Sequence, residues 1–391
     1  MVSIRGISAM MMLALLSAAI WAYLILARGG FWRAAERDEP DVAASPSAWP
    51  AVVAVVPARN EADVIGRAVT SLLVQDYAGP FRVVIVDDDS ADATAQEATA
   101  AAAQLSKSDR LTILRGSPLP NGWTGKLWAL HQGLIAADET APTYYWLSDA
   151  DITYKPDTLR MMVARAAQGD LAAVSLMARL RCVSFAEKML IPAFIFFFQM
   201  LYPFRWVNQA GSRTAAAAGG CVLVNRKVLT ELGGIAAIRG ALIDDCTLAA
   251  LLKGQGRKIW LGLTHRADSI RIYDHFDDIR RMVARSAYAQ LRYSSAILLA
   301  TLIGMALVYV VPPAIALFGS APANYIALAT WAGMALVFIP TLQYYNVSWL
   351  WGPFLPVIAV CYMAFTLDSA LQYAAGRGGQ WKGRVQASRD M

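Results

Sequence analysis

Four long apolar stretches constrain this chain more than any other feature of its sequence. A helix needs about 20 mostly apolar residues to cross a bilayer, and the stretches near this length are residues 7–27, 296–318, 325–342 and 350–367. The first is too long for the apolar region of a signal peptide, and no A-x-A-like cleavage site follows it. We therefore expect an N-terminal membrane anchor in residues 1–35 and membrane helices in residues 295–375.

The composition also indicates a membrane protein. Hydrophobic residues make up 57% of the 391 residues and charged residues 16%, whereas soluble proteins average roughly 45–50% and about 25%. The net charge of +6 is spread along the chain, which favours anionic lipid headgroups over nucleic acid as its partner. The cysteines and histidines show no ligand spacing, so we expect reduced thiols and no zinc site.

Basic residues beside the apolar stretches predict which side of the membrane each part occupies. Arg28, Arg33 and Arg37 follow the first stretch, whereas Arg5 alone precedes it. Cytoplasmic flanks of membrane helices collect Lys and Arg. We therefore expect residues 40–290 in the cytoplasm, on a multi-pass protein of the bacterial inner membrane.

The basic tail, residues 376–391, conflicts with a simple count of spans. Its basic residues include Arg377, Lys382, Arg384 and Arg389. They predict a cytoplasmic tail, but three crossings after a cytoplasmic domain would place the tail outside. Either one C-terminal segment is re-entrant, or a helix is broken at Pro312 and Pro313.

Residues 50–294 alternate between strand-like and helix-like patterns after a polar linker. The segments that read as strands are residues 51–56, 81–86, 111–114, 144–147 and 222–225. The first two are continuous apolar runs, which suit strands of a parallel sheet buried on both faces. Helical spacing covers residues 61–75 and 91–105, the second with Ser90 as a candidate N-cap. This order predicts an α/β domain with a mainly parallel sheet, whose active-site loops follow the carboxyl ends of the strands.

Two later segments have the character of membrane-surface helices. Residues 185–204 contain a run of uncharged, aromatic-rich residues that is too short to span a bilayer comfortably. Residues 277–293 are basic and amphipathic, with Arg281, Arg285 and Arg292 on one helical face. We expect an interfacial helix at each place, with a buried core helix as the alternative for the first.

The strongest chemical signal is the triplet Asp149-Ala150-Asp151 at the end of an apolar strand. Residues i and i+2 of an extended segment point the same way, so both carboxylates can bind one hard cation, Mg²⁺ or Mn²⁺, together with a diphosphate. Such a cation stabilises charge on a leaving nucleoside diphosphate. Many D-x-D triplets are only solvated loop residues, so this one gains weight from its neighbours.

Three consecutive carboxylates, Asp87, Asp88 and Asp89, end the second strand and form a like-charge cluster that needs an offsetting partner. A uracil N–H and the cation would supply one, and helix capping by Asp89 or Ser90 is the alternative. A dinucleotide-binding fold would also place an acid here. That fold is a poor fit, because no G-x-G-x-x-G follows the first strand.

Two glycine-containing loops carry further candidates. Lys126 ends the loop 122–126 and begins a helix over 127–135, where it meets either a phosphate or solvent. Gly219 and Gly220 precede the last predicted strand and permit either close approach of an acceptor to the backbone or a plain tight turn.

A second acid pair, Asp244 and Asp245, opens a helix over residues 246–253. One of these carboxylates is a candidate general base, because an adjacent carboxylate and burial raise a pKa. Acids at a helix N-terminus also complement the helix dipole, so both interpretations stay open.

Taken in order, these segments resemble the family 2 inverting glycosyltransferases, which have the GT-A fold. The matching residues are Val56-Pro57-Ala58-Arg59-Asn60-Glu61, Val86 to Asp92, Gly125-Lys126 with Ala129 and Gly133, Asp149-Ala150-Asp151, Gly219-Gly220-Cys221 and Asp244-Asp245. The resemblance covers residues 50–295. A narrower likeness, to the hopene-associated subfamily of hopanoid biosynthesis, depends on the loop 121–126 and on Gln290-Leu291-Arg292-Tyr293.

The resemblance implies a UDP-linked nucleotide sugar as donor and a lipid, a hopanoid in the subfamily, as acceptor. It implies a cation at Asp149 and Asp151 and a general base at Asp245 beside Asp244. The implied nucleotide-sugar contacts are Pro57, Glu61, Asp87, Asp88, Lys126 and Asp149. The implied acceptor or phosphate contacts are Gly220, Arg281, Arg285, Gln290 and Arg292.

The chain departs from the family pattern at two places. The acid pair is usually Glu-Asp but is Asp244-Asp245 here, and the Q-x-x-R-W motif of processive members appears as Gln290-Leu291-Arg292-Tyr293. We infer transfer of one sugar rather than synthesis of a polymer. Two alternatives stay open: a polyprenyl-phosphate sugar transferase, and a catalytically silent membrane scaffold or transporter subunit that retains the fold.

Overall fold

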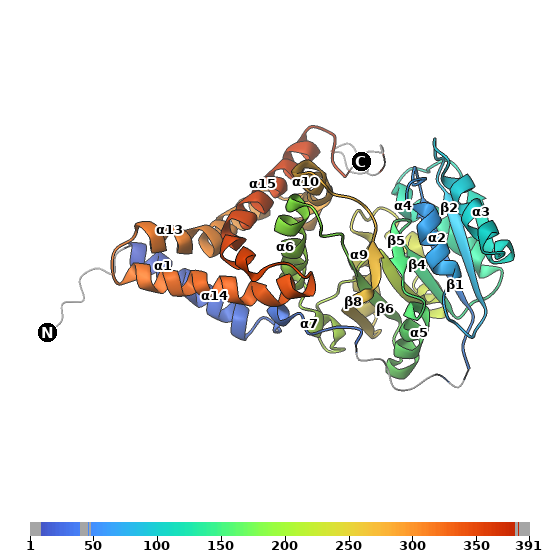
Figure 1. The fold of residues 1–391 in the computed structure, drawn as a ribbon, viewed down its shortest axis with the longest axis horizontal. Coiled ribbons are helices and arrows are strands. Elements are labelled where there is room, and N and C mark those ends of the chain that lie inside the picture. Colours follow the sequence, from blue (N-terminus) through green and yellow to red (C-terminus); the bar gives the residue numbers. More distant parts are fainter. Residues whose placement is uncertain (1–8, 40–45, 47, 380–381, 383–391) are drawn as a thin grey trace.

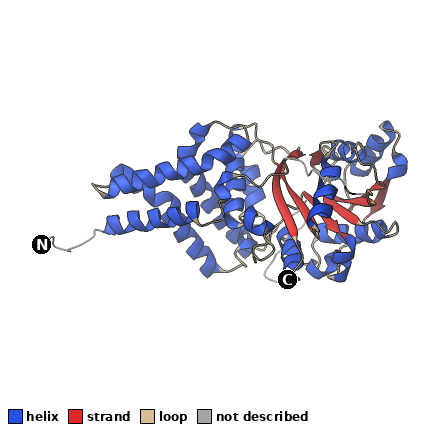
Figure 2. Ribbon diagram, turned by 90° about the horizontal axis from the view of Figure 1, so that it is seen from below, coloured by secondary structure: helices blue, strands red, loops and turns tan. Residues whose placement is uncertain are grey.

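The strands and the long apolar helices occupy opposite ends of the molecule. The computed structural model describes residues 9–39, 46, 48–379 and 382. Figure 1 shows the apolar helices projecting away from the sheet, and Figure 2 shows the strands gathered at the other end. Much of the predicted linker lies outside the described residues, as do Ile7, Arg5, Arg384 and Arg389.

The strands of the described residues form one eight-stranded sheet in the order β3-β2-β1-β4-β7-β6-β8-β5. The strands are β1 (Val52–Ala58), β2 (Phe81–Asp87), β3 (Leu111–Arg115), β4 (Tyr144–Ser148), β5 (Ile152–Tyr154), β6 (Ala173–Arg179), β7 (Cys221–Asn225) and β8 (Ile259–Ser269). Pairing is parallel across β3, β2, β1 and β4 and between β6 and β8, and antiparallel at β7 and β5. The five predicted strands and the mainly parallel α/β architecture are thus confirmed.

The strand register brings the candidate residues to one edge of the sheet. Asp87 ends β2 beside the end of β1, and the D-x-D triplet follows directly after β4. Because β7 is antiparallel to β4, its first residue, Cys221, pairs with Ser148. The loop before β7 therefore lies next to the triplet, and the carbonyl oxygen of Gly220 accepts the N–H of Asp149 at 3.3 Å.

Helices cover both faces of this sheet. One face packs against α2 (Ile65–Leu73), α3 (Thr94–Gln104) and α5 (Thr158–Gly169), the other against α4 (Gly125–Asp138) and α9 (Asp244–Gly254). Along β1, Ala54 and Val56 are buried in the first core, and Val53 and Val55 in the second. This is the pattern of a strand that is covered on both sides, as the continuous apolar run predicts.

The predicted helix 91–105 begins later than expected and without the predicted cap. α3 starts at Thr94, whose N–H is accepted by Asp92 Oδ1 at 3.1 Å. The Ser90 hydroxyl oxygen instead accepts the backbone N–H of Asn60 at 3.0 Å. The prediction of Ser90 as an N-cap is therefore wrong, because this hydroxyl ties the loop after β2 to the loop after β1.

The remaining elements belong partly to the sheet domain and partly to the helical part. They are η1 (Phe31–Arg33), η2 (Ser108–Arg110), α6 (Phe185–Leu201), α7 (Phe204–Asn208), α8 (Arg226–Glu231), η3 (Ile235–Ile238), α10 (Phe276–Ala284), α11 (Ala287–Gln290), η5 (Trp349–Phe354) and α15 (Leu355–Ala374). The predicted helix 277–293 is thus two helices, α10 and α11, and Arg292 lies beyond them with a φ of 53°. The three arginines therefore do not share one helical face.

Within the described residues, four helices are long and apolar enough to cross a membrane, in agreement with the four predicted stretches. They are Ala9–Leu26, Ser295–Phe318, Ala323–Tyr344 and Trp349–Ala374. In Figure 1, α1 (Ala9–Leu26), α13 (Val311–Phe318) and α14 (Ala323–Tyr344) extend together away from the sheet, and all three contact one another.

Two consecutive prolines do not break the second apolar helix. α12 (Ser295–Met305) passes into a π-helical turn, Ala306–Val310, and α13 follows with Pro312 and Pro313 in its first turn. A proline lacks the N–H that a regular α-helical turn requires, and the wider π turn precedes the place where those donors are missing. The predicted break at this pair is therefore replaced by a local widening.

The last apolar segment turns back toward the sheet domain. η5 returns along α14, where Trp331 Nε1 donates to the carbonyl oxygen of Pro353 at 2.9 Å. α15 then leads to α10, where Asp368 pairs with Arg280. α15 thus begins beside the middle of α14 and ends beside the sheet domain.

α6, the first of the two predicted interfacial helices, lies between the sheet domain and the apolar helices (Figure 1). Its start has a capping box, in which Ser184 accepts the N–H of Glu187 and the Glu187 carboxylate accepts the N–H of Ser184. Phe196 packs against Phe338 of α14, and Phe197 against Tyr362 of α15. Most side chains of this helix are buried in the protein. This agrees with the alternative prediction of a buried core helix.

Candidate active site

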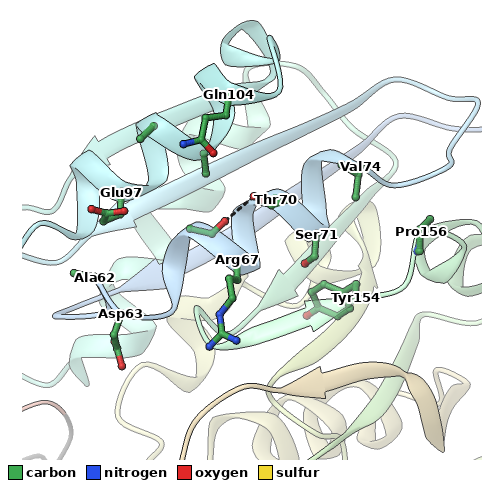
Figure 3. Close-up of a pocket in the computed structure, with 13 residues that line it drawn as sticks. Ala62, Asp63, Arg67, Thr70, Ser71, Val74, Glu97, Gln104, Tyr154 and Pro156 are labelled. Carbon is green, nitrogen blue, oxygen red and sulfur yellow. Dashed lines mark hydrogen bonds between the residues drawn. The ribbon is translucent and has the colours of Figure 1, made fainter.

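A cavity of about 540 Å³ opens at the edge of the sheet where β1 and β4 end. Its polar lining consists of Glu61, Thr124, Lys126, Asp149, Asp151, Asp244, Arg271, Tyr273, Asp278, Arg281, Arg285 and Lys382. A second cavity, of about 580 Å³, lies between α2 and α3 (Figure 3). The second cavity contains no predicted site residue, so the first is the candidate active site.

Lys126 bridges the two acid motifs inside this cavity. It lies in the first turn of α4, and its Nζ is 2.9 Å from Asp149 Oδ1 and 3.1 Å from Asp244 Oδ2. Burial lowers the pKa of Lys126, but the two carboxylates outweigh burial and raise the pKa above its usual value. Lys126 is therefore a permanent cation that joins the loop after β4 to the start of α9.

Asp149 shows the opposing influences on a buried carboxylate. Burial raises its pKa, Lys126 lowers it, and neighbouring Asp151 raises it again, so that the pKa lies above its usual value. A site with this balance favours additional positive charge beside Asp149.

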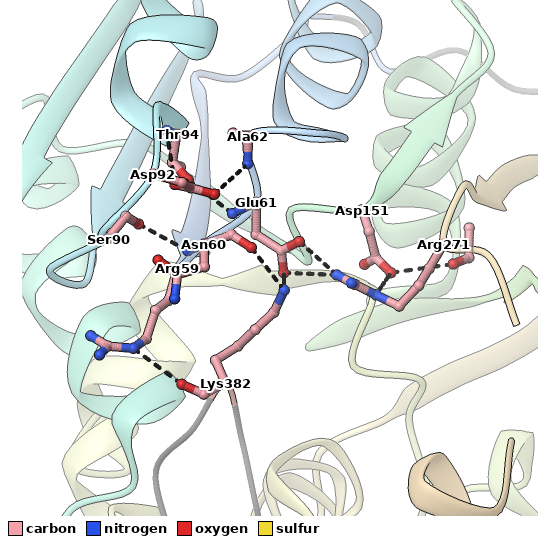
Figure 4. Close-up of polar contacts among 11 residues, drawn as sticks. Arg59, Asn60, Glu61, Ala62, Ser90, Asp92, Thr94, Asp151, Arg271 and Lys382 are labelled. Atoms are coloured by element: carbon pink, nitrogen blue, oxygen red, sulfur yellow. Dashed lines mark hydrogen bonds and ion pairs between the residues drawn. The ribbon is translucent and has the colours of Figure 1, made fainter. Parts of the chain in front are cut away.

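Arg271 holds the second carboxylate of the triplet (Figure 4). Its Nε lies 2.9 Å from Asp151 Oδ2, and its Nη2 lies 2.7 Å from both carboxylate oxygens of Glu61. Burial lowers the pKa of Arg271, but Asp151 and Glu61 raise it further, so the guanidinium stays charged. This arginine ties the loop after β1 to the loop after β4.

Asp244 and Asp245 point in different directions from the start of α9. Asp244 lines the cavity, whereas Asp245 accepts the N–H of Gly219 at 2.8 Å and the N–H of Cys246 at 2.7 Å. Burial and the charge of Asp244 raise the pKa of Asp245 to about 6. A Cβ added to Gly219 would lie 3.2 Å from both Lys126 Nζ and Asp245 Oδ2, so at least one of these side chains would have to shift by a few tenths of an ångström.

The carboxylates that end β2 lie beside the cavity rather than in its lining. Asp88 is 1% exposed, and Arg59 lies 4.0 Å from its carboxylate and donates to its carbonyl oxygen. Asp87 Oδ1 accepts the N–H of Ser90 at 3.0 Å. Arg59 thus supplies the offsetting partner that this acidic cluster needs, and neither acid is among the described residues that line the cavity.

The predicted acceptor contacts divide into two groups. Arg281 and Arg285 line the cavity, and Gly220 adjoins Asp149, whose Oδ2 would be 3.7 Å from an added Cβ. Gln290 and Arg292 are not among the described lining residues, and Gln290 donates to the hydroxyl of Tyr202 at 2.6 Å. The break between α10 and α11 separates these two residues from the cavity.

The D-x-D carboxylates fit a divalent cation that is shared with a diphosphate. Among the described residues, no three His, Cys, Asp or Glu side chains converge as a complete metal site. Mg²⁺ usually takes one or two protein carboxylates and completes its shell with phosphate oxygens and water. Asp149 and Asp151 line one cavity and are the residues that would hold such a cation.

The comparisons with known proteins agree with this geometry. Residues 53–233 match the family model of glycosyl transferase family 2. This domain has the GT-A fold. A solved structure of similar fold is the mannosyltransferase PcManGT from Pyrobaculum calidifontis in complex with GDP-Man and Mn2+. It has a TM-score of 0.57 and 20% identity, over 93% of this chain and 98% of that chain.

A sequence relative of this chain is the succinoglycan biosynthesis protein ExoO of Rhizobium meliloti (strain 1021). The two proteins are 38% identical over 161 residues, which cover 37% of this chain and 42% of the relative. The chain thus spans less than half the length of that relative. The likeness to PcManGT, at its low identity, shows the fold alone.

Sequence reasoning missed several residues of the GT-A domain that line the cavity. No motif contains Arg271, Tyr273 or Asp278. In the sequence, Lys382 is marked only as one of the basic residues of the tail. Arg271 follows the end of β8. Its position just after a strand is the one sequence feature that could have identified it as a site residue. Burial raises the pKa of Tyr273 to about 12, so this hydroxyl stays protonated in the cavity.

Proposed function

We propose that this protein is a membrane-embedded inverting glycosyltransferase that moves a sugar from a nucleotide-sugar donor, UDP-linked, to a lipid acceptor. The observation that carries the proposal is the convergence of Glu61, Lys126, Asp149, Asp151 and Asp244 in one cavity of the GT-A domain. Carboxylates for a cation and a buried lysine near phosphate are groups that this reaction needs.

The donor would bind between the loops after β1 and β4. Pro57 and Glu61 contribute contacts to the nucleotide, and Lys126 to the diphosphate. A divalent cation held by Asp149 and Asp151 would stabilise the charge of the leaving diphosphate. Lys126 already lies between Asp149 and Asp244, so it is held in place before the donor arrives and loses little side-chain entropy on binding.

Asp245 is the proposed general base, and Asp244 the residue that positions Lys126. Because Asp245 lies outside the cavity lining and its Oδ2 accepts the N–H of Gly219, this role requires that contact to open when the acceptor binds. The acceptor oxygen attacks the anomeric carbon as its proton passes to the Asp245 carboxylate, and the bond from that carbon to the diphosphate breaks with its electron pair. The configuration at the carbon inverts. A pKa of about 6 suits this role, because the carboxylate is ionised at neutral pH and still basic enough to accept a proton.

An apolar surface beside the cavity supports a lipid acceptor. Ile272 lines the cavity and is 58% exposed. Phe185 and Phe276 are exposed close by, and the ring of Phe185 lies 5.4 Å from that of Trp351, which belongs to the fourth apolar helix. A lipid could keep its apolar body on this surface while its hydroxyl reaches the cavity. The subfamily resemblance adds a hopanoid as the proposed acceptor.

The position of Lys382 supports a specific membrane arrangement. Its Nζ lies 2.8 Å from Glu61 Oε1, so the tail and the GT-A domain share one side of any bilayer. An even number of crossings must then follow the domain. Because η5 turns back along α14, we propose that Trp349–Ala374 is re-entrant and that the other three apolar helices cross. The basic residues after α1 support a cytoplasmic position for the domain.

A polyprenyl-phosphate acceptor is the second candidate. The observation that favours it is the presence of two guanidinium groups, Arg281 and Arg285, in the lining of the same cavity. Arginine binds phosphate well, and a phosphate acceptor needs little help from a general base. In that case Asp245→Asn would retain most of its transfer activity.

The direct test is to incubate membranes that contain the protein with radiolabelled nucleotide sugars and to extract the lipid. We expect label in lipid from one donor, with stimulation by Mg²⁺ or Mn²⁺. Asp151→Ala should abolish both transfer and stimulation, whereas Glu231→Ala, which removes an exposed carboxylate paired with Arg257, should change neither.

Three results would contradict these assignments. If Asp151→Ala still showed metal-stimulated transfer, Asp151 would not be a cation ligand. If the wild-type protein neither transferred nor hydrolysed any donor, the silent scaffold would be the remaining function. Label confined to a phosphate-linked lipid would favour the second candidate.

A further inference from the structure

Lys382 enters the cavity of the GT-A domain from the segment after the last apolar helix (Figure 4). Its ammonium group lies 2.8 Å from Glu61 Oε1 and donates to the carbonyl oxygen of Asn60, 322 positions away, at 3.0 Å. The backbone adds a contact, because Arg59 Nε donates to the carbonyl oxygen of Lys382 at 3.4 Å. Three consecutive residues after β1 therefore hold this lysine.

The charges around the cavity explain why a lysine at this position matters for an anionic ligand. Among the described residues, the carboxylates that line the cavity are Glu61, Asp149, Asp151, Asp244 and Asp278, and the cations are Lys126, Arg271, Arg281, Arg285 and Lys382. Five negative groups thus face five positive ones. Without Lys382 they would face four, and the net negative charge of the cavity would repel a nucleotide diphosphate.

The individual cations differ in how much of their charge the neighbouring carboxylates offset. Lys126 lies between two carboxylates, whereas Lys382 contacts Glu61, whose charge Arg271 already offsets. An ammonium group has three N–H donors, and the contacts among the described residues use two from Lys382, on Glu61 and Asn60. The third is available to a ligand, since the lysine lines the cavity and its side chain is 22% exposed.

We propose that Lys382 is a donor-binding residue, whose ammonium group contacts a phosphate oxygen of the nucleotide sugar. The basic tail thereby completes the active site of the GT-A domain. This inference rests on the proposed function, since it requires a nucleotide sugar as ligand. It adds a residue that lies beyond residues 53–233, the part that matches the family model.

Binding of radiolabelled nucleotide sugar to the purified full-length protein in detergent tests this role directly. Loss of one charge-assisted hydrogen bond should weaken binding roughly 10- to 100-fold in Lys382→Ala. Lys382→Arg keeps the charge and should recover most of the affinity. The matched control is Arg377→Ala, which removes a tail cation whose guanidinium donates to Gln372 outside the cavity, and it should bind as wild type does.

Kinetics separate donor binding from a merely structural role of the tail. In Lys382→Ala the KM for the donor should rise by a similar factor, while the KM for the acceptor and the melting temperature stay unchanged. A chain that ends at residue 375 should show the same loss of donor affinity. If Lys382→Ala lowered the melting temperature and both KM values together, the lysine would be a structural residue and the proposal would fail.

Two binding results would also overturn the proposal. Unchanged donor affinity in Lys382→Ala would show that the ammonium group does not contact the donor. Tighter binding would show that the lysine blocks the site instead of contributing to it. Failure of the wild-type protein to bind any nucleotide sugar would instead refute the proposed function itself, so the two failures are distinguishable.

Discussion

Replacing Arg271 by methionine should destabilise the GT-A domain, because two largely buried carboxylates lose the cation that they share. The guanidinium lies 2.7 Å from the Glu61 carboxylate and 2.9 Å from that of Asp151. These acidic side chains are only 8% and 14% exposed, so water cannot replace the lost partner fully.

The structure sets the size of this effect. Removing one partner of a buried ion pair costs about 3–5 kcal/mol. We expect about 3 kcal/mol, the low end of that range, because Lys382 remains beside Glu61 and the Arg271 side chain is itself 28% exposed. In a domain of this size, such a loss lowers the melting temperature by roughly 6–12 °C.

Thermal unfolding of the purified protein in detergent, followed by tryptophan fluorescence, measures the change. The matched control is Arg257→Met, which removes a surface ion pair whose side chains are 45% and 42% exposed and should cost less than about 1 kcal/mol. Excess Mg²⁺ or Mn²⁺ should stabilise Arg271→Met more than wild type, since a cation can replace the lost charge beside Asp151. Equal melting temperatures for the two variants would refute the electrostatic reasoning.

Two further predictions concern the acid pair and the glycine beside it. Asp245→Asn should lower kcat roughly 10²- to 10⁴-fold, the range for loss of a general base, with nucleotide binding retained. Because burial and Asp244 raise the pKa of Asp245 to about 6, wild-type kcat/KM should rise with pH up to about 6 and then level off, since the base acts only after losing its proton. Normal turnover in Asp245→Asn, or a flat profile from acidic to neutral pH, would argue against this base. Gly219→Ala should reduce turnover about 10-fold, because the added Cβ would lie 3.2 Å from Lys126 Nζ and Asp245 Oδ2. In Gly211→Ala the added Cβ meets nothing within 4 Å, so turnover equal to that of Gly219→Ala would contradict this explanation.

The sequence by itself determined five of the eight strands and the edge at which the cavity forms. A strand that is buried on both faces has a continuous apolar sequence. Such runs predicted the strands that lead to Asp87 and Asp149. The carboxyl ends of parallel strands meet at one edge of a sheet. The positions of Asp151 and Lys126 near one another follow from that rule, as do the four apolar helices from length and composition alone.

Only the tertiary structure decided which side chains face the cavity and which partners they meet. Asp244 and Asp245 open the same helix, but neighbouring positions point about 100° apart, so the packing of α9 selects the one that lines the cavity. Arg271 meets Glu61 across 210 positions, and Lys382 reaches the same carboxylate from the tail. No local pattern marks such contacts, because they arise when separate segments are brought to one place by the packing of the whole chain.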